Sequence, residues 1–128
     1  MRITRIYADE HGASHFSDAE VPTTSVQLFA ELPPFRVNRF NTPTPIKLFA
    51  VPDELDVADW HTAPVRQLAV ALNGIVEYEA SDGEVRRLAP GEILLVEDTS
   101  GRGHITRFAD GEQCFLHIPV PDDWTLMD

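Results

Sequence analysis

Three polar side chains, His61, Gln67 and His104, have types and spacing that could do chemistry together. Counting in twos along an extended chain puts His61 and Gln67 on one face of a strand, and His104 can approach from a neighbouring strand. Two imidazoles suit a divalent metal ion, whereas an amide oxygen is a weaker ligand than a carboxylate. We therefore expect at most one weakly bound metal ion, Zn, Fe, Ni or Mn, with these three residues as tentative ligands.

The same three side chains can also act without a metal, by hydrogen-bonding a small polar molecule, water or one another. Two further residues are expected to take part in such ligand binding. Arg102, in the loop before His104, is a candidate for holding an anionic group. Tyr78 is a candidate for the pocket wall, although inward aromatic residues are more often plain core.

Four other polar residues, which are named next, could also take part in a site, but their sequence context is less specific. Glu97 and Asp98 precede a glycine-rich loop and could supply a carboxylate at the mouth of the site, although paired acids on a turn are usually solvated, which is the expectation here. His15 lies in a segment that is poor in helix formers and is expected to be a surface histidine. His117 shares a strand face with Phe115 and is expected to be a core or rim histidine rather than a ligand.

Short strands are the elements that must position these residues. Ten prolines and seven glycines punctuate the chain, and no helical period of apolar residues survives for three turns between them. The sequence predicts strands, with a loop over 53–59, at residues 2–7, 25–31, 46–51, 67–72, 75–80, 84–88, 92–97, 104–108 and 113–120. Strands at this density predict an all-β sandwich or small barrel.

Two of these strands carry the clearest local signals. Asp82-Gly83 predicts a two-residue hairpin turn with positive φ at both positions, joining the strands on either side. The strand before it alternates Val76, Tyr78 and Ala80 on one face with glutamates on the other, which is typical of a half-buried strand. The run over 93–96 is apolar on both faces and predicts a fully buried strand.

The segments over 60–74 and 88–104 together resemble the paired motifs of the cupin superfamily. His61 falls on the first histidine of the first motif, Gln67 falls on its glutamate, and His104 falls on the histidine that ends the second motif. The resemblance implies an antiparallel jelly-roll β-barrel, a homodimer, and commonly a divalent metal inside the barrel. It implies one domain over 1–128, with N-terminal wrapping or edge strands over 1–52 and barrel strands over 60–120.

The departures from the cupin motifs bear on the metal more than on the fold. Ala63 stands where the second histidine belongs, Gln67 replaces a carboxylate, and Thr99 stands at the usual proline. Two functions therefore stay open. One is a cupin-like protein that binds a small polar molecule without a strong metal site. The other is a metal-dependent cupin enzyme of the oxygenase, isomerase or lyase class, with His61, Gln67 and His104 as ligands.

Composition sets the outer bounds of these predictions. The 128 residues match the usual size of one domain, and 43% hydrophobic residues can supply a core. A formal charge of −11 disfavours partners that are nucleic acids or anionic membranes. The lone Cys114 cannot form an internal disulfide, and no apolar segment has the length of a membrane span, so we expect a cytoplasmic protein. Proline-bounded N-terminal strands with open edges predict a homodimer.

Overall fold

The computed structural model describes residues 1–108 and 112–126, and every regular element in those two ranges is a β-strand. No helix that could cross a membrane occurs within them. The strands are β1 (Arg2–Ala8), β2 (Ser14–Glu20), β3 (Thr24–Val26), β4 (Phe35–Val37), β5 (Lys47–Ala50), β6 (Val57–His61), β7 (Gln67–Ala71), β8 (Val76–Ala80), β9 (Val85–Leu88), β10 (Ile93–Val96), β11 (His104–Phe108) and β12 (Cys114–Pro119). The all-β prediction is confirmed.

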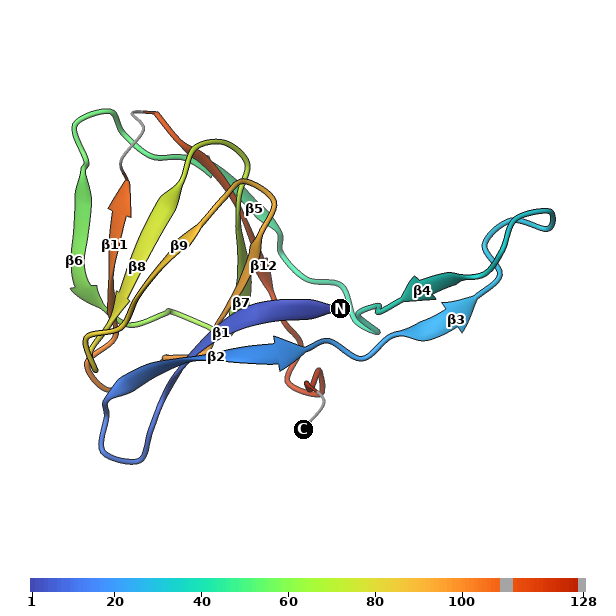
Figure 1. The fold of residues 1–128 in the computed structure, drawn as a ribbon, viewed down its shortest axis with the longest axis horizontal. Coiled ribbons are helices and arrows are strands. Elements are labelled where there is room, and N and C mark those ends of the chain that lie inside the picture. The colour runs from blue at the N-terminus through green and yellow to red at the C-terminus, as the bar shows by residue number, and fades with distance from the viewer. Residues whose placement is uncertain (109–111, 127–128) are drawn as a thin grey trace.

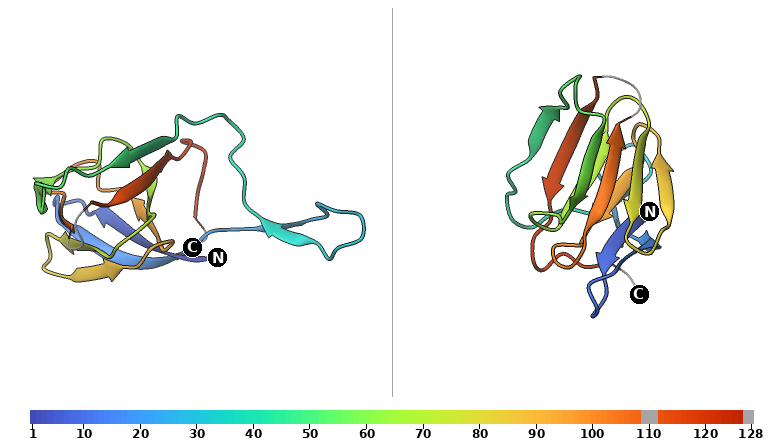
Figure 2. Two further views of the ribbon diagram at one scale, coloured as in Figure 1. Left: turned by 90° about the horizontal axis from the view of Figure 1, so that it is seen from above. Right: turned by 90° about the vertical axis from the view of Figure 1, so that its left-hand side faces the viewer.

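Two sheets form the body of the molecule, as Figures 1 and 2 show. The larger sheet has the order β2-β1-β10-β7-β12-β5, and the smaller has the order β6-β11-β8-β9. Only the β1–β10 pair is parallel among the described pairs. The main core lies between the sheets, where Leu94 and Phe115 of the larger sheet pack in one cluster with Val76 and Tyr78 of the smaller. The described strands form separate sheets and show no closed barrel.

The hairpin predicted at Asp82-Gly83 is present, but its turn differs from the expected one. β8 and β9 pair in antiparallel fashion around it. Gly83 has φ of +95°, whereas no described residue other than glycine has positive φ. The Gly83 N–H donates to the Ala80 carbonyl at 3.0 Å and the Ala80 N–H donates to the Glu84 carbonyl at 2.9 Å. These bonds make a three-residue loop, in which only the last residue must be left-handed.

The burial patterns of two strands confirm the predicted faces. In β8, Val76, Tyr78 and Ala80 are buried, while the glutamates between them face outward. In β10, Leu94, Leu95 and Val96 are all buried, because this strand lies between β1 and β7 with apolar clusters on both faces of the sheet.

The N-terminal half departs most from the predicted strands. β2 was not predicted, because its sequence carries only Phe16 as a large apolar residue, yet its full length pairs with β1. The predicted strand over 25–31 ends at Val26, and β4 follows Pro33-Pro34. The predicted loop over 53–59 is wrong from Val57 onward, where β6 pairs with β11 at the edge of the smaller sheet. Edge pairing supplies the order that these polar segments do not specify themselves.

β3 and β4 form a two-stranded ribbon that pairs with no other strand of the described chain. We call residues 22–46 the arm. Figures 1 and 2 show that the arm extends away from the body. The C-terminal segment returns to its base, where the Trp124 indole N–H donates to Asn38 Oδ1 at 2.7 Å. Trp124 is buried there, so the described part of the C-terminal segment packs against the body.

Candidate functional site

A cavity of about 90 Å³ lies between the two sheets of the body. Both sheets contribute to its wall, and the wall mixes aromatic and small apolar side chains with five polar ones. The polar residues are Gln67, Tyr78, His104, Thr106 and His117, and the others are Phe49, Ala63, Ala69, Val96, Phe108 and Phe115. Three of the five predicted site residues, Gln67, Tyr78 and His104, are therefore brought to one cavity.

The polar groups of this wall are buried but mostly unpaired. Gln67, Tyr78, His104 and Thr106 are each between 4% and 6% exposed. Among the described residues, the side chains of Gln67, Tyr78 and Thr106 have no hydrogen-bond partner, and their polar atoms are not among the unpaired ones fully closed off from solvent, which are Asp98 Oδ1 and Gln113 Oε1. Burial raises the pKa of the Tyr78 phenol above its ordinary value, so the hydroxyl keeps its proton. Buried polar groups are normally hydrogen-bonded, so these side chains are available to something held in the cavity.

His104 is fixed in orientation by a buried carboxylate. Its Nδ1 lies 2.6 Å from Oδ2 of Asp98, and Asp98 is fully buried. Since a carboxylate only accepts, Nδ1 carries the hydrogen and the ring is held with Nε2 on its opposite side. The second oxygen of Asp98, Oδ1, is buried without a partner in the described structure. The prediction that Asp98 is a solvated surface acid is wrong.

Asp98 is held by the backbone around it, and Glu97 faces the other way. The Asp98 carbonyl accepts the Ala63 N–H at 3.1 Å, which ties this turn to the segment after β6. Glu97 accepts from Arg5 and Arg66, so it is also not a plain solvated acid. The sequence signal that could have separated the two acids is strand alternation. Val96 faces the cavity, so Asp98, two residues later, falls on the same side.

His61 lies beside His104 but outside the cavity wall. The two residues are register partners between β6 and β11, with ring centroids 4.5 Å apart. The Nδ1–H of His61 donates to the Asp59 carbonyl at 2.7 Å, and the residue is exposed. Gly103 permits this approach, because a Cβ at that position would lie 2.0 Å from the His61 carbonyl oxygen. The structure therefore places His61 at the outer side of His104.

His117 contributes a neutral imidazole to the opposite part of the wall. It lies on β12 beside Phe115, and its ring meets that of Phe49 edge to face at 4.7 Å. Burial, aided by the positive charge of Lys47, lowers the pKa of His117 to about 4. At neutral pH this side chain is uncharged, so it can donate one hydrogen bond and accept another. The prediction of a core or rim histidine agrees with this position in the wall.

Arg102 and Trp60 lie away from the cavity. Arg102 is exposed in the loop before β11, where its backbone N–H donates to the Gly12 carbonyl at 2.9 Å. Trp60 is 46% exposed on β6. Arg66, the residue before β7, is not part of the cavity wall and donates to Glu97. The described wall therefore carries no arginine, and the hydrogen-bond donors that it offers are neutral side chains.

The donor set fits a metal ion poorly. Within residues 1–108 and 112–126, no group of three or more histidine, cysteine, aspartate and glutamate side chains is arranged to hold one. His61 and His104 supply two imidazoles, and Gln67 supplies a neutral amide. His15, predicted to be a surface histidine, is partly exposed and also bridges Asp9 and Asp82 through its two ring nitrogens at 2.7 Å each. A scan of protein-family models finds no match to this chain, and neither does a search of curated proteins.

Proposed function

We propose that this chain is a cupin-like protein of the jelly-roll type, whose cavity binds a small polar molecule. The observation that carries the proposal is the group of buried, unpaired polar side chains on the cavity wall. Gln67 and Tyr78 have no partner among the described residues, and Nε2 of His104 has none either. The two motif segments support the cupin likeness, because they place Gln67 on β7 and His104 on β11 of facing sheets.

The size of the cavity limits what can enter it. At about 90 Å³ it is smaller than an engineered cavity of about 150 Å³ that accommodates benzene. The ligand group that enters is therefore smaller than an aromatic ring. The side chains of Gln67, Tyr78 and Thr106 can all donate hydrogen bonds, so the group that they best satisfy carries acceptor oxygens. Carboxylates and carbonyls of small molecules meet both conditions.

Asp98 decides which hydrogen bond His104 can offer in this site. Because Asp98 accepts the Nδ1–H of His104, Nε2 is left as a hydrogen-bond acceptor. A small carboxylic acid can donate its O–H to Nε2 while its carbonyl oxygen accepts from Tyr78 or Gln67. A carbonyl compound without an O–H or N–H is held by Tyr78 and Gln67 alone. We infer that the site takes a small carboxylic acid or carbonyl compound.

Ligand-observed NMR with acetate, pyruvate and acetamide as probes tests this function. We expect binding by the parent chain and a loss of affinity of about tenfold in Tyr78→Phe, the effect of one buried hydrogen bond. Tyr7→Phe changes the other tyrosine, which is not part of the cavity wall, and is expected to bind as the parent does. Absence of binding by all three probes, or equal binding by Tyr78→Phe, contradicts the proposal.

A metal-dependent cupin enzyme is the second candidate, and one observation favours it. His61 and His104 lie side by side, and Asp98 orients His104 as carboxylates orient metal-bound histidines. Calorimetric titration with Zn²⁺ or Ni²⁺ tests it, with the double variant His61→Ala, His104→Ala as control. Near-stoichiometric binding that the double variant loses supports the enzyme. Weak binding that is equal in both proteins contradicts it.

A further inference from the structure

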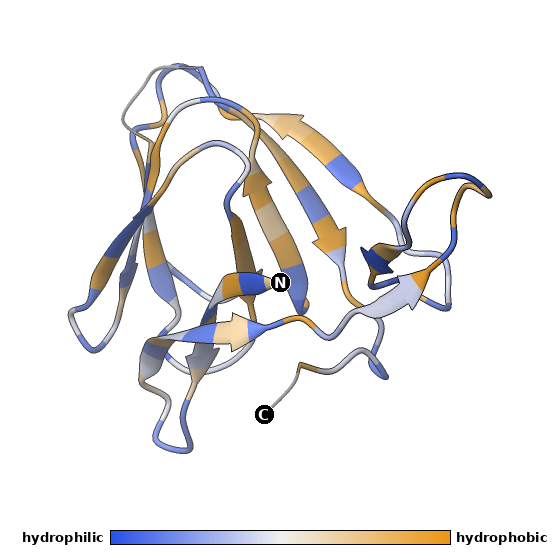
Figure 3. Ribbon diagram, turned by 45° about the vertical axis from the view of Figure 1, so that its right-hand side comes forward, coloured by the Kyte–Doolittle hydropathy of each residue, from blue (hydrophilic) through white to orange (hydrophobic). Residues whose placement is uncertain are grey.

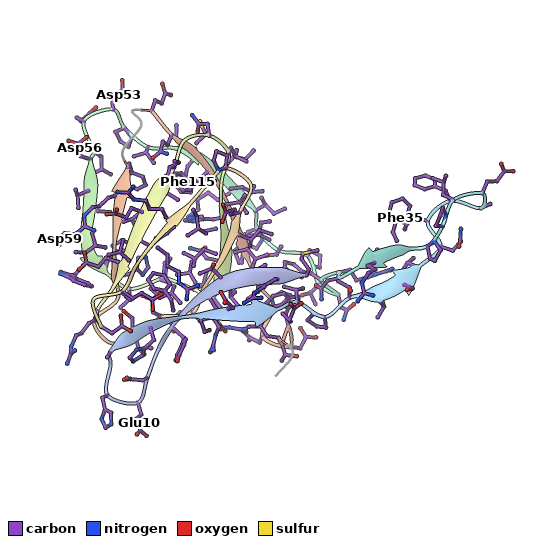
Figure 4. All side chains as sticks on the ribbon, in the orientation of Figure 1. Glu10, Phe35, Asp53, Asp56, Asp59 and Phe115 are labelled. Carbon is purple, nitrogen blue, oxygen red and sulfur yellow. The ribbon has the colours of Figure 1, made fainter. Side chains whose placement is uncertain are left out.

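The arm carries apolar side chains that its own chain leaves uncovered. Leu28, Phe29, Leu32 and Phe35 surround its end and are between 43% and 58% exposed. Figure 3 shows hydrophobic residues along this ribbon, and Figure 4 places Phe35 far from the body. Phe29 and Phe35 contact each other edge to face at 6.1 Å, so they form one small cluster. We call these four residues the arm tip.

The arm has little internal support for an ordered ribbon. β3 and β4 share three register pairs, from Thr24 with Val37 to Val26 with Phe35. An isolated two-stranded hairpin is marginally stable in water, and it needs a further surface to pack on. The side chain of Gln27 ties the turn by donating to two backbone carbonyls, which leaves the apolar groups of the arm tip on the outside.

An apolar groove of about 320 Å³ lies on the body at the base of the arm. It covers the outer face of the larger sheet, on the side opposite the cavity, and only one of its wall residues is polar. The wall is made by Met1, Ile3, Val21, Asn38, Phe40, Leu68, Ile93, Ile118 and Trp124. We call this the outer groove. Val21 directly precedes the arm, and Asn38 and Phe40 belong to the base of the arm, so the arm begins at the edge of the outer groove. Figure 2 shows that the ribbon then extends away from the body.

Charge also separates the arm from the body. The charged residues of the arm are Arg36, Arg39 and Glu31, so the arm has a formal charge of +1. Since the whole chain has a formal charge of −11, the remaining residues together carry −12. Two bodies therefore repel each other, whereas an arm is attracted to the body of another molecule. This complementarity favours a partner whose body is acidic and carries an apolar groove, and a second copy of this chain has both.

We propose that the arm tip of one copy packs into the outer groove of a second copy, and that the second copy reciprocates. The exchange is a two-fold symmetric contact, in which each groove receives the other copy's arm. It covers the apolar groups of both surfaces, and it gives the ribbon the packing surface that it lacks within one chain. It also specifies which surfaces make the homodimer expected from the sequence.

The mass in solution at micromolar concentration tests the arm tip. The parent is expected at twice its 14.3 kDa, and the double variant Phe29→Asp, Phe35→Asp at 14.3 kDa with an unchanged circular dichroism spectrum. Val57→Asp, Val85→Asp is the matched control, because these residues are 45% and 44% exposed on the smaller sheet, and it is expected to stay dimeric. A monomeric parent, a dimeric arm variant or a monomeric control each overturns the proposal.

Disulfide cross-linking then tests which surface of the second copy the arm tip contacts. In a Cys114→Ser background, we mix a Phe29→Cys chain with an Ile118→Cys chain under mild oxidation. Contact between arm tip and outer groove is expected to give mostly the mixed disulfide, since Ile118 lies in the groove wall. Disulfides between two Phe29→Cys chains that outnumber the mixed product would instead show arms packed on one another and would overturn the proposal.

Discussion

The cavity and the arm are incomplete in opposite ways. In the cavity, the buried side chains of Gln67 and Tyr78 have no hydrogen-bond partner among the described residues, whereas in the arm apolar groups such as Phe29 and Phe35 remain in water. Each arrangement costs free energy in an isolated chain, by lost hydrogen bonds in one case and by exposed apolar surface in the other. The chemistry of the partner that suits each region follows from what that region lacks, which is hydrogen bonds in the cavity and apolar contacts in the arm. A small molecule with acceptor oxygens suits the cavity, and an apolar protein surface suits the arm.

The two regions also differ in how firmly the chain holds them. The cavity lies in a core cluster that joins both sheets, and Phe115 at its centre is 2% exposed. The arm is held by its short ribbon and by bonds at its base, including that of Asn38 with Trp124. Substitutions in the body are therefore expected to change the free energy of unfolding, and substitutions in the arm to change association.

The largest expected effect comes from a substitution at Gly103, which tests how closely β6 and β11 approach each other beside His104. Gly103→Ala puts a methyl group 2.0 Å from the His61 carbonyl oxygen at a backbone φ of +74°, so one of the two strands must move. We expect a loss of more than about 4 kcal/mol in the free energy of unfolding, measured in urea. Gly83→Ala is the control, because its φ is +95° but no atom lies within 4 Å. It is expected to cost about 1–2 kcal/mol, and equal losses would contradict the close approach of β6 and β11.

The features that the sequence could predict are those encoded by a local pattern, and the features that it missed depend on contacts between distant segments. The alternation in β8 and the spacing of Gln67 and His104 report burial directly, so the all-β structure and three residues of the cavity wall were predictable. Asp98 was misjudged although strand alternation after Val96 places it on the cavity side, because its contacts with Ala63 and His104 join segments distant in sequence, which no local pattern encodes. β2 was missed for a similar reason, since its order comes from pairing with β1.

The second prediction compares one phenylalanine from each region, both labelled in Figure 4. Phe115→Ala empties a position between the two sheets and is expected to cost about 3–5 kcal/mol. Phe35→Ala truncates a side chain that is 43% exposed and is expected to cost less than about 0.5 kcal/mol in dilute protein. Urea unfolding at low and high protein concentration checks both values. The cost of Phe35→Ala should grow with concentration, because it removes a contact made only by associated copies.

The smallest expected effect concerns the charge of His117 in the cavity wall. A change of pH near neutrality tests the cavity and not the arm, because residues 22–46 contain no histidine. Burial lowers the pKa of His117 from 6.5 to about 4. Below about pH 6.5 the unfolded chain therefore binds a proton at His117, whereas the folded chain does not bind it until the pH approaches 4. The free energy of unfolding therefore falls as the pH is lowered. The folded pKa implies a loss of about 2 kcal/mol between about pH 7.5 and pH 5, which His117→Gln should remove.

His15 provides the opposing control for this pH experiment. Its bonds to Asp9 and Asp82 raise its pKa above 6.5, so its contribution is fully present below that pH and is lost as pH rises through the raised value. His15→Gln should therefore lower stability at acid pH and have little effect at alkaline pH, the reverse of His117→Gln. Urea unfolding of both variants across this pH range measures the two curves. If His117→Gln leaves the acid side of the parent curve unchanged, His117 is solvated rather than buried, and the cavity loses one of the polar groups by which it differs from the arm.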